Sequence, residues 1–243
     1  MTLIATADLS DLPRRPLRVL VAEDNPVNQR MVAAFLEQRG HASVMAADGR
    51  AAVASLEIEA FDVVLMDLEM RGMDGFEATA AIRDRERTTG AHIHIIAVTA
   101  HAGPESRRRC LAAGMDGYLS KPLRYGELIA AVEGSPPARE ARTAPEASRE
   151  ISAPFVADAL RLGLEIRDAA ARRDGETLAY AAHQLRGTAG YFAAGRAWEL
   201  AKRLEELGRA GDLTARVEEA CAELDLELAR LERTLRARKE DLV

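Results

Sequence analysis

The amino-acid sequence predicts an α/β domain with a five-stranded parallel sheet, followed by an all-α domain that folds as an antiparallel four-helix bundle. In the first half, which is rich in Val, Ile and Met, five apolar strand patterns alternate with five helical patterns. The last part is dominated by Ala, Leu, Arg and Glu and contains no apolar run of the β type. A chain of 243 residues is long enough for two domains, each with its own core.

The composition argues against several classes of protein. The formal net charge is -6, which gives no basic surface for nucleic acid or for an anionic membrane. No apolar stretch approaches the roughly 20 residues that a membrane-spanning helix needs, so we expect no membrane insertion. Cys110 and Cys221 lie in different halves of the chain, which argues against a structural disulfide and favours a reducing, cytoplasmic location.

The first domain follows a lead-in, residues 1–16, which is predicted to be disordered. Its Pro13 and Pro16 suit the start of a protein and equally a linker from a preceding domain. The predicted strands are 18–22, 42–46, 61–67, 93–98 and 117–119. The predicted helices are 26–38, a helix that begins near 49, 76–86, 106–113 and 125–133. Five β/α units in about 120 residues predict a doubly wound, flavodoxin-like sheet in a domain of residues 17–134.

A linker is predicted over residues 135–153, where Pro, Ala, Arg and Glu residues form no periodic apolar face. The second domain is 154–243. Its predicted helices carry apolar residues at three- and four-residue spacing and cover 155–172, 176–194, 197–210 and 213–236. The pairs Asp174-Gly175 and Gly211-Asp212 mark the turns between helices, so short connections favour an antiparallel bundle.

Carboxylates follow two of the predicted strands. Asp67 ends an apolar run that begins at Phe61, and Glu23 and Asp24 follow the run that ends at Ala22. Ligands of open parallel sheets collect outside the carboxyl ends of the strands, so we expect these acids in one pocket. Their mutual repulsion calls for a cation, and Mg²⁺ prefers a few carboxylates, waters and phosphoryl oxygens.

Two further side chains are predicted at the same edge of the sheet. Thr99 closes the fourth strand, and Lys121 follows the fifth strand and supplies a point charge for a phosphoryl oxygen. Asp67 is then a candidate nucleophile, because aspartyl phosphate is an established type of covalent intermediate. A nucleophile, a hydroxyl, a cation and a metal together are what in-line phosphoryl transfer requires.

These residues lie in motifs that resemble the response-regulator receiver domain, of the kind attached to hybrid histidine kinases, over residues 17–133. The motifs are Val21-Ala22-Glu23-Asp24-Asn25-Pro26-Val27-Asn28-Gln29, Met66-Asp67-Leu68-Glu69-Met70, Val98-Thr99-Ala100 and Tyr118-Leu119-Ser120-Lys121-Pro122. The resemblance implies that Asp67 is the phosphoacceptor and that Glu23, Asp24, Asp67 and the backbone carbonyl of Glu69 bind Mg²⁺. It also implies a switch pair of Thr99 and Tyr118, with Lys121 as a catalytic cation.

The resemblance implies two further features and shows one departure. The Lys121-Pro122 peptide bond is expected to be cis, which X-Pro bonds reach at low cost. Val27, Asn28 and Met31 on the first helix are expected to dock against a partner domain. Where many receivers have Met-Pro after the phosphoacceptor, this chain has Met70-Arg71, which changes the turn but removes no ligand.

In the second domain the informative stretch is Ala182 to Gly190. Gly187 lies four residues after His183, on the same helix face, and clears space beside the imidazole at a cost of about 1 kcal/mol in helix propensity. Arg186 puts a cation near any anion on that imidazole. The stretch resembles the histidine phosphotransfer (HPt) domain, with Arg186 in place of Lys and Thr188 in place of Ser, over residues 155–236. The resemblance implies that His183 is a phosphoacceptor.

The two resemblances predict a phosphorelay protein. Asp67 would accept a phosphoryl group from the phosphohistidine of an upstream histidine kinase, and His183 would relay phosphoryl to or from a receiver aspartate. No Walker motif or ATP-binding kinase domain is present, so we expect a phosphotransfer protein whose receiver promotes its own phosphorylation and dephosphorylation.

Two alternatives stay open at this point. The chain can act as a non-relaying binding module or phosphate sink that modulates a kinase, or the bundle can serve dimerisation with His183 incidental. His41, His92, His94 and His101 are predicted to have no role.

Overall fold

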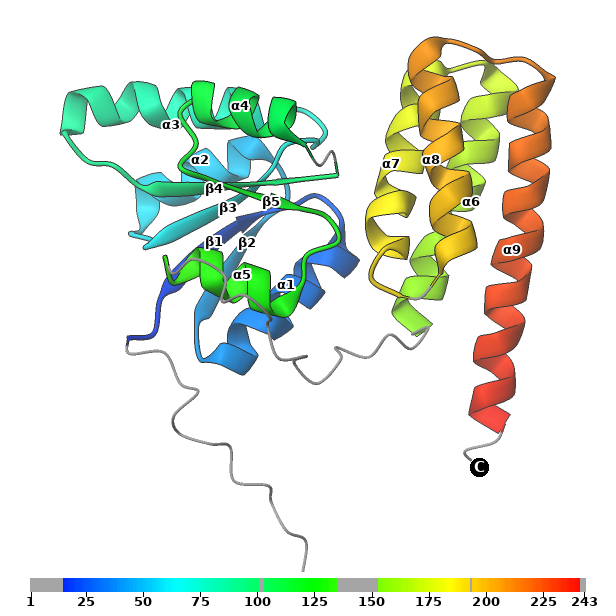
Figure 1. Ribbon diagram of the computed structural model, residues 1–243, viewed down its shortest axis with the longest axis horizontal. Coiled ribbons are helices and arrows are strands. Elements are labelled where there is room, and N and C mark those ends of the chain that lie inside the picture. Colours follow the sequence, from blue (N-terminus) through cyan, green and yellow to red (C-terminus); the bar gives the residue numbers. More distant parts are fainter. Residues whose placement is uncertain (1–14, 101–102, 135–152, 193, 241–243) are drawn as a thin grey trace, which may run out of the picture. The chain divides into compact units, whose positions relative to one another are not determined.

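A computed structural model describes residues 15–100, 103–134, 153–192 and 194–240 (Figure 1). The chain divides into two compact units, an N-terminal unit of Met1–Ala144 and a C-terminal unit of Pro145–Val243. Most of the predicted lead-in and of the predicted linker, residues 1–14 and 135–152, lies outside the described residues. Each unit is described by itself.

The N-terminal unit is built on a five-stranded sheet. The strands are β1 (Arg18–Ala22), β2 (Ala42–Ala46), β3 (Val63–Asp67), β4 (His94–Thr99) and β5 (Gly117–Ser120). They lie in the order β2-β1-β3-β4-β5, and every neighbouring pair is parallel. The strand order reverses between β1 and β3, which confirms the predicted doubly wound, flavodoxin-like α/β fold.

Helices cover both faces of this sheet. They are α1 (Pro26–Arg39), α2 (Gly49–Ile58), α3 (Gly75–Thr89), α4 (Pro104–Ala112) and α5 (Tyr125–Val132). Figure 1 shows α1 and α5 on one face and α2, α3 and α4 on the other. All five residues of β3 are buried, as predicted for a central strand covered on both faces.

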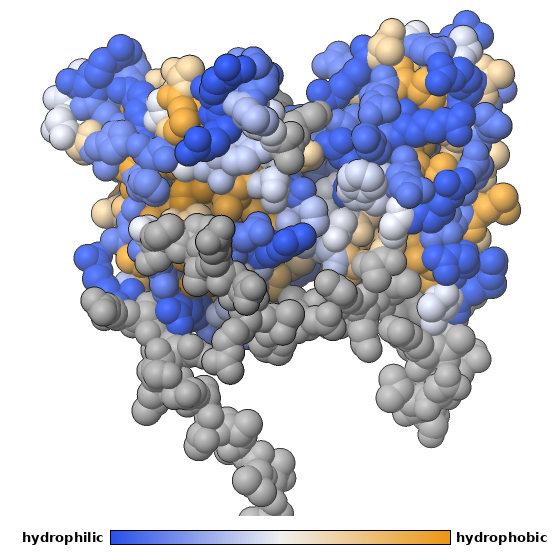
Figure 2. Space-filling view, in the orientation of Figure 1, coloured by the Kyte–Doolittle hydropathy of each residue, from blue (hydrophilic) through white to orange (hydrophobic). Residues whose placement is uncertain are grey.

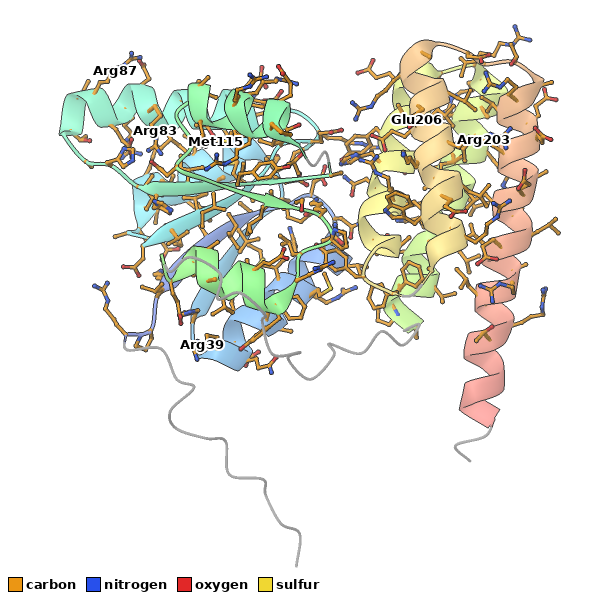
Figure 3. All side chains as sticks on the ribbon, in the orientation of Figure 1. Arg39, Arg83, Arg87, Met115, Arg203 and Glu206 are labelled. Atoms are coloured by element: carbon orange, nitrogen blue, oxygen red, sulfur yellow. The ribbon has the colours of Figure 1, made fainter. Side chains whose placement is uncertain are left out.

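Local sequence fixes the ends of these helices. The side chain of Asn25 accepts the N–H groups of Val27 and Asn28 and so begins α1, while Gly40 ends it with φ 89°. Asp74 and Glu77 form a reciprocal capping box at the start of α3. On α3, Arg83 (Figure 3) donates from Nε to the Gly114 carbonyl at 2.8 Å, which ties the helix to the loop before β5.

The C-terminal unit contains the helices α6 (Ala153–Arg172), α7 (Gly175–Ala189), α8 (Gly195–Ala210) and α9 (Ala215–Glu240). They pack around one core of Leu, Ala, Ile, Val and Phe side chains, which confirms the predicted four-helix bundle. Hydrophilic residues cover the outer surface of α8 (Figure 2). Over the residues that the structure describes, no helix is long and apolar enough to span a membrane.

The end of α7 differs from the prediction, which extended this helix to residue 194. The helix ends at Ala189, and Gly190 is its C-cap. The N–H of Tyr191 donates to the Thr188 carbonyl in a turn. The ring of Phe192 then stacks on Phe155 of α6, with centroids 4.7 Å apart. Aromatic packing against a neighbouring helix therefore outweighs the helical pattern of this segment.

Candidate functional site

The three predicted carboxylates come together at the carboxyl edge of the sheet. Glu23 and Asp24 follow β1, and Asp67 ends the adjacent strand β3. One oxygen from each carboxylate lies within 4.8 Å of one from each of the others. Glu23 and Asp67 are buried, so their charges lie close together with little water to screen them.

Lys121 supplies a cation to this group. Its Nζ lies 2.7 Å from Glu23 Oε2 and 2.6 Å from Asp67 Oδ2, and its side chain is buried. The Lys121 backbone N–H donates to the Thr99 carbonyl at 2.7 Å, which fixes the segment after β5 beside the end of β4. The Lys121-Pro122 peptide bond is cis, as the resemblance implied.

The surroundings of Asp67 oppose its charge. Burial raises the pKa of the Asp67 carboxyl well above its ordinary value; the Lys121 ammonium opposes this shift and Glu23 adds to it. The Glu69 backbone N–H donates to Asp67 Oδ1 at 3.2 Å. The carboxylate form that a nucleophile needs therefore depends on the donors and cations placed beside it.

The predicted switch residues lie at the same edge. Thr99 is the buried last residue of β4, and Tyr118 lies in β5, paired in register with Ala97. The Tyr118 hydroxyl accepts the N–H of Gly103, which is the N-cap residue of α4, at 3.2 Å. Tyr118 is thus connected to the start of α4, and the switch role of the two residues stays a prediction.

The residues present fit a hard divalent cation. Three carboxylates converge, whereas Lys121 contributes a single positive charge. Glu23, Asp24 and Asp67 offer the oxygen ligands that Mg²⁺ prefers, and the predicted backbone ligand Glu69 lies in the loop directly after β3. A divalent cation at this position would offset the remaining repulsion between the acids.

A second group of charged side chains surrounds His183 in the C-terminal unit. His183 Nδ1 lies 3.2 Å from Oε1 of Glu205, which projects from the neighbouring helix α8. Arg186 Nε lies 3.2 Å from Glu205 Oε2, and Arg209 Nη2 donates to Oε1 at 2.8 Å. Because a carboxylate only accepts hydrogen bonds, Glu205 favours the tautomer with the proton on Nδ1, which leaves the Nε2 lone pair for chemistry.

Sequence reasoning found His183, Arg186 and Gly187 but missed Glu205 and Arg209. Glu205 lies between Leu204 and Leu207 on the apolar face of α8, and it is buried there. A buried acid needs partners, so the position of a Glu on an apolar helix face is the sequence feature that could have identified Glu205. The remaining motif residue, Thr188, donates to the Gln184 carbonyl at 3.1 Å within the helix.

The predicted docking residues lie at the start of α1. Val27 is buried and Met31 is half-buried. The side-chain amide of Asn28 donates to Glu23 Oε1 at 3.0 Å, so this residue contacts the acidic group rather than standing apart from it. Docking at these positions stays a prediction.

The other histidines that the structure describes contact different residues. His41 accepts the Leu17 N–H at Nδ1, and burial lowers its pKa. His92 Nε2 lies 2.7 Å from Asp116 Oδ1. His94 Nδ1 lies 4.0 Å from Asp116 Oδ2, and His101 lies outside the described residues.

Both cysteines are free and buried. Burial raises the pKa of Cys110, and it raises the pKa of Cys221 to about 11, so both stay thiols at neutral pH.

Both units match known protein families. Residues 19–133 match the response regulator receiver domain, and residues 150–234 match the Hpt domain. The sensor protein GacS of Pseudomonas syringae pv. syringae is 45% identical over 123 residues, which are 50% of this chain and 14% of that protein. Hybrid signal transduction histidine kinase I of Dictyostelium discoideum is 42% identical over 113 residues, which are 44% of this chain and 6% of that protein. The matched region is thus a small part of these relatives.

Two solved structures are also similar to about half of the chain. The receiver domain of a sensor histidine kinase from Pseudomonas aeruginosa, solved with a magnesium ion in its active site cleft, is 40% identical with a TM-score of 0.45. The match covers 50% of this chain and all of that one. The complex of the Saccharomyces cerevisiae phosphotransfer protein Ypd1 with the Ssk1 receiver domain gives 30% identity and a TM-score of 0.47. It covers 48% of this chain and 86% of that one.

An acidic cluster at the strand ends of a doubly wound sheet, and a histidine beside a glutamate and two arginines on a helix bundle, are the features of a protein of two-component phosphorelays. The chain thus contains a response regulator receiver domain at residues 19–133, followed by an Hpt domain at residues 150–234.

Proposed function

We propose that Asp67 accepts a phosphoryl group from the phosphohistidine of a histidine kinase and that His183 relays phosphoryl to or from a receiver aspartate. The observation that carries the proposal is the Lys121 ammonium, 2.6 Å from Asp67 Oδ2 and 2.7 Å from Glu23 Oε2. It places a fixed positive charge where phosphoryl oxygens would arrive. Glu23, Asp24 and Asp67, with the Glu69 carbonyl, would hold Mg²⁺.

At Asp67 the reaction is a transfer from nitrogen to oxygen. A carboxylate oxygen of Asp67 attacks phosphorus, the P–O bond forms as the P–N bond of the donor breaks, and the electron pair returns to the donor imidazole. Lys121 stabilises negative charge on the phosphoryl oxygens, and Thr99 offers a hydroxyl at the same edge. When bound, Mg²⁺ neutralises and orients the phosphoryl oxygens.

At His183 the transfer runs between oxygen and nitrogen. Nε2 attacks the phosphorus of a receiver aspartyl phosphate, the P–N bond forms, and the P–O bond breaks to release the carboxylate. The imidazole becomes more positive in this step, and Glu205 holds the Nδ1 proton and offsets that charge. Arg186 supplies a cation beside the new phosphoryl group, and Gly187 leaves room on the same helix face.

The partners follow from these two steps. An upstream histidine kinase supplies the phosphoryl group, and a receiver domain exchanges phosphoryl with His183. The matched relative from Dictyostelium discoideum is named a hybrid signal transduction histidine kinase, which supports this assignment. We propose boundaries of 17–134 for the receiver domain and 154–243 for the Hpt domain; the family matches cover residues 19–133 and 150–234.

Phosphotransfer time courses test the proposal. A phosphorylated kinase would be mixed with the wild type, Asp67→Asn or His183→Gln. We expect Asp67→Asn to remove the base-labile acyl phosphate and His183→Gln to remove the acid-labile, base-stable phosphohistidine, because glutamine has no nucleophilic ring nitrogen. Acid-labile, base-stable phosphate on the Hpt domain of His183→Gln would contradict the assignment. If His183 never exchanges phosphoryl with any receiver, the protein does not relay.

A further inference from the structure

The two acids that follow β1 are held by groups outside the proposed reaction. The Asn28 side-chain amide donates to Glu23 Oε1 at 3.0 Å, and the Arg71 backbone N–H donates to Asp24 Oδ2 at 3.1 Å. Asn28 lies in the first turn of α1, and Arg71 lies in the loop between β3 and α3. Each acid is therefore tied to a different segment of the fold.

The contact to Asp24 comes from the position at which this sequence departs from the receiver pattern. Many receivers have Pro after the Met that corresponds to Met70, and Pro has no N–H to donate. Here Arg71 restores the N–H, and the hydrogen bond uses the backbone rather than the guanidinium. This donor contacts one of the two carboxylate oxygens of Asp24, Oδ2.

The contact to Glu23 forms part of a fuller set. Oε1 accepts both the Asn28 amide and the Asn25 backbone N–H, at 3.0 and 3.1 Å, while Oε2 contacts Lys121 at 2.7 Å. The Gln29 side chain donates to the Glu23 carbonyl at 2.6 Å. A glutamate has more rotatable bonds than an aspartate, so these contacts restrict a side chain that would otherwise turn away from like charges.

We infer that the Asn28 amide and the Arg71 backbone N–H are positioning groups that hold Glu23 and Asp24 ready for a divalent cation. The inference rests on the proposed function, in which these acids bind Mg²⁺. Hydrogen bonds to ligating carboxylates fix their orientation before the metal arrives, and the loss of such partners weakens metal binding. The departure from Pro at position 71 therefore strengthens the site.

A matched pair of variants isolates the backbone donor. Arg71→Pro and Arg71→Ala lose the same side chain and the same charge, but only Arg71→Pro loses the N–H. Mg²⁺ affinity of the full chain would be measured by isothermal titration calorimetry at constant ionic strength. We expect the Kd for Mg²⁺ to rise about tenfold in Arg71→Pro and to change less than about twofold in Arg71→Ala. Equal Kd values for the two variants would overturn the role of the N–H.

Asn28→Ala tests the other group, with Arg30→Ala as the control on the exposed face of α1. We expect a rise of about tenfold in Kd for Asn28→Ala and none for Arg30→Ala. Thermal melts without Mg²⁺ identify any variant that fails to fold. Wild-type affinity in both Arg71→Pro and Asn28→Ala would refute the inference while the proposed function stands. An absence of Mg²⁺ binding in the wild type would refute the metal assignment and the inference together.

Discussion

The site around Asp67 is assembled from segments far apart in the sequence, whereas the site around His183 is assembled from two neighbouring helices. Lys121 lies 54 residues from Asp67 and 98 residues from Glu23 along the chain. His183 and Glu205 are separated by 22 residues, and each lies on a helix of the same bundle. The first site therefore needs β1, β3 and β5 of the sheet to be in place. The second site needs α7 and α8 to pack correctly against each other.

The two sites also differ in their balance of charge. At Asp67 three carboxylates meet one ammonium, which leaves an excess of negative charge that favours a cation. At His183 two guanidinium groups meet one carboxylate, which leaves an excess of positive charge that favours a phosphoryl anion. In the proposed relay, the phosphoryl group would pass between a site whose acids need a further cation and a site that already carries an excess of cations.

The largest effect is expected from removing the ammonium of the first site. Lys121→Ala leaves Glu23 and Asp67 buried without their cation, and breaking a buried ion pair in this way costs about 3–5 kcal/mol. The single tryptophan, Trp198, packs against the core of the bundle and reports on the Hpt domain. In urea titrations, circular dichroism should show an earlier receiver transition while the Trp198 fluorescence midpoint stays in place.

Arg124→Ala is the control for this variant, because Arg124 is an exposed cation three residues further on. Its ion pair with Glu127 is a surface pair, and its loss should cost at most about 1 kcal/mol. If Lys121→Ala proves as stable as Arg124→Ala, the buried ammonium does not hold the acids together. A shift in the Trp198 midpoint would show that the two units do not unfold independently.

The second prediction concerns the cation that the first site is expected to bind. A ligand that binds only the folded state stabilises it by about 2.7 kcal/mol at a hundredfold excess over its Kd. Thermal melts of the wild type should therefore move upward with millimolar Mg²⁺. Asp24→Asn combined with Asp67→Asn should abolish the shift, and the fluorescence of Trp198 should report no effect on the bundle. A wild-type melt that Mg²⁺ leaves unchanged argues against the metal.

The contrast between the sites also explains what could be predicted from the sequence. Asp67, Glu23 and Asp24 directly follow apolar runs, and parallel strands bring their carboxyl ends to one edge, so topology alone predicted their proximity. Glu205 follows no such rule. It lies among leucines on a helix, and only the packing of α8 on α7 shows that it reaches His183.

Backbone groups and tertiary contacts account for the other omissions. Any residue except Pro supplies the backbone N–H that Arg71 donates to Asp24. The sequence therefore showed that Arg71 replaces the usual Pro, but it could not show the contact to Asp24. The early end of α7 depends on the stacking of Phe192 on Phe155 of another helix. Local patterns predict elements, and contacts between elements decide such details.

The third prediction tests the close packing of α7 against α8, the two helices that build the second site. A Cβ added to Gly208 would lie 2.8 Å from the Ala179 nitrogen and 2.8 Å from the Gly175 carbonyl oxygen. Gly208→Ala should therefore push α8 away from α7, at a cost of about 2 kcal/mol for overpacking. The Trp198 midpoint should fall while the receiver transition stays in place.

Gly195→Ala is the matched control, because a Cβ at the start of α8 meets nothing within 4 Å. The same methyl group is added to the same helix without a clash. A Gly208→Ala protein that unfolds at the wild-type midpoint would show that the helices separate without cost.

The smallest effect is expected from Glu205→Gln, which retains the size of the side chain and removes its charge. A glutamine presents either an oxygen or an N–H to His183, so the imidazole should populate both neutral tautomers instead of one. Loss of the charge also removes stabilisation of the more positive imidazole during transfer. We expect transfer through His183 to slow about tenfold, which corresponds to about 1.4 kcal/mol.

Nitrogen-15 NMR of the His183 ring in the full chain measures the tautomer directly, and transfer rates measure the consequence. Glu206→Gln is the control, since Glu206 is the next residue on α8 and its side chain is exposed (Figure 3). It should leave both readouts unchanged. A purely structural role for Glu205 would lower stability without altering the ratio of tautomers. If Glu205→Gln keeps the wild-type tautomer and rate, the positive excess from Arg186 and Arg209 is sufficient, and the acid does not orient the imidazole.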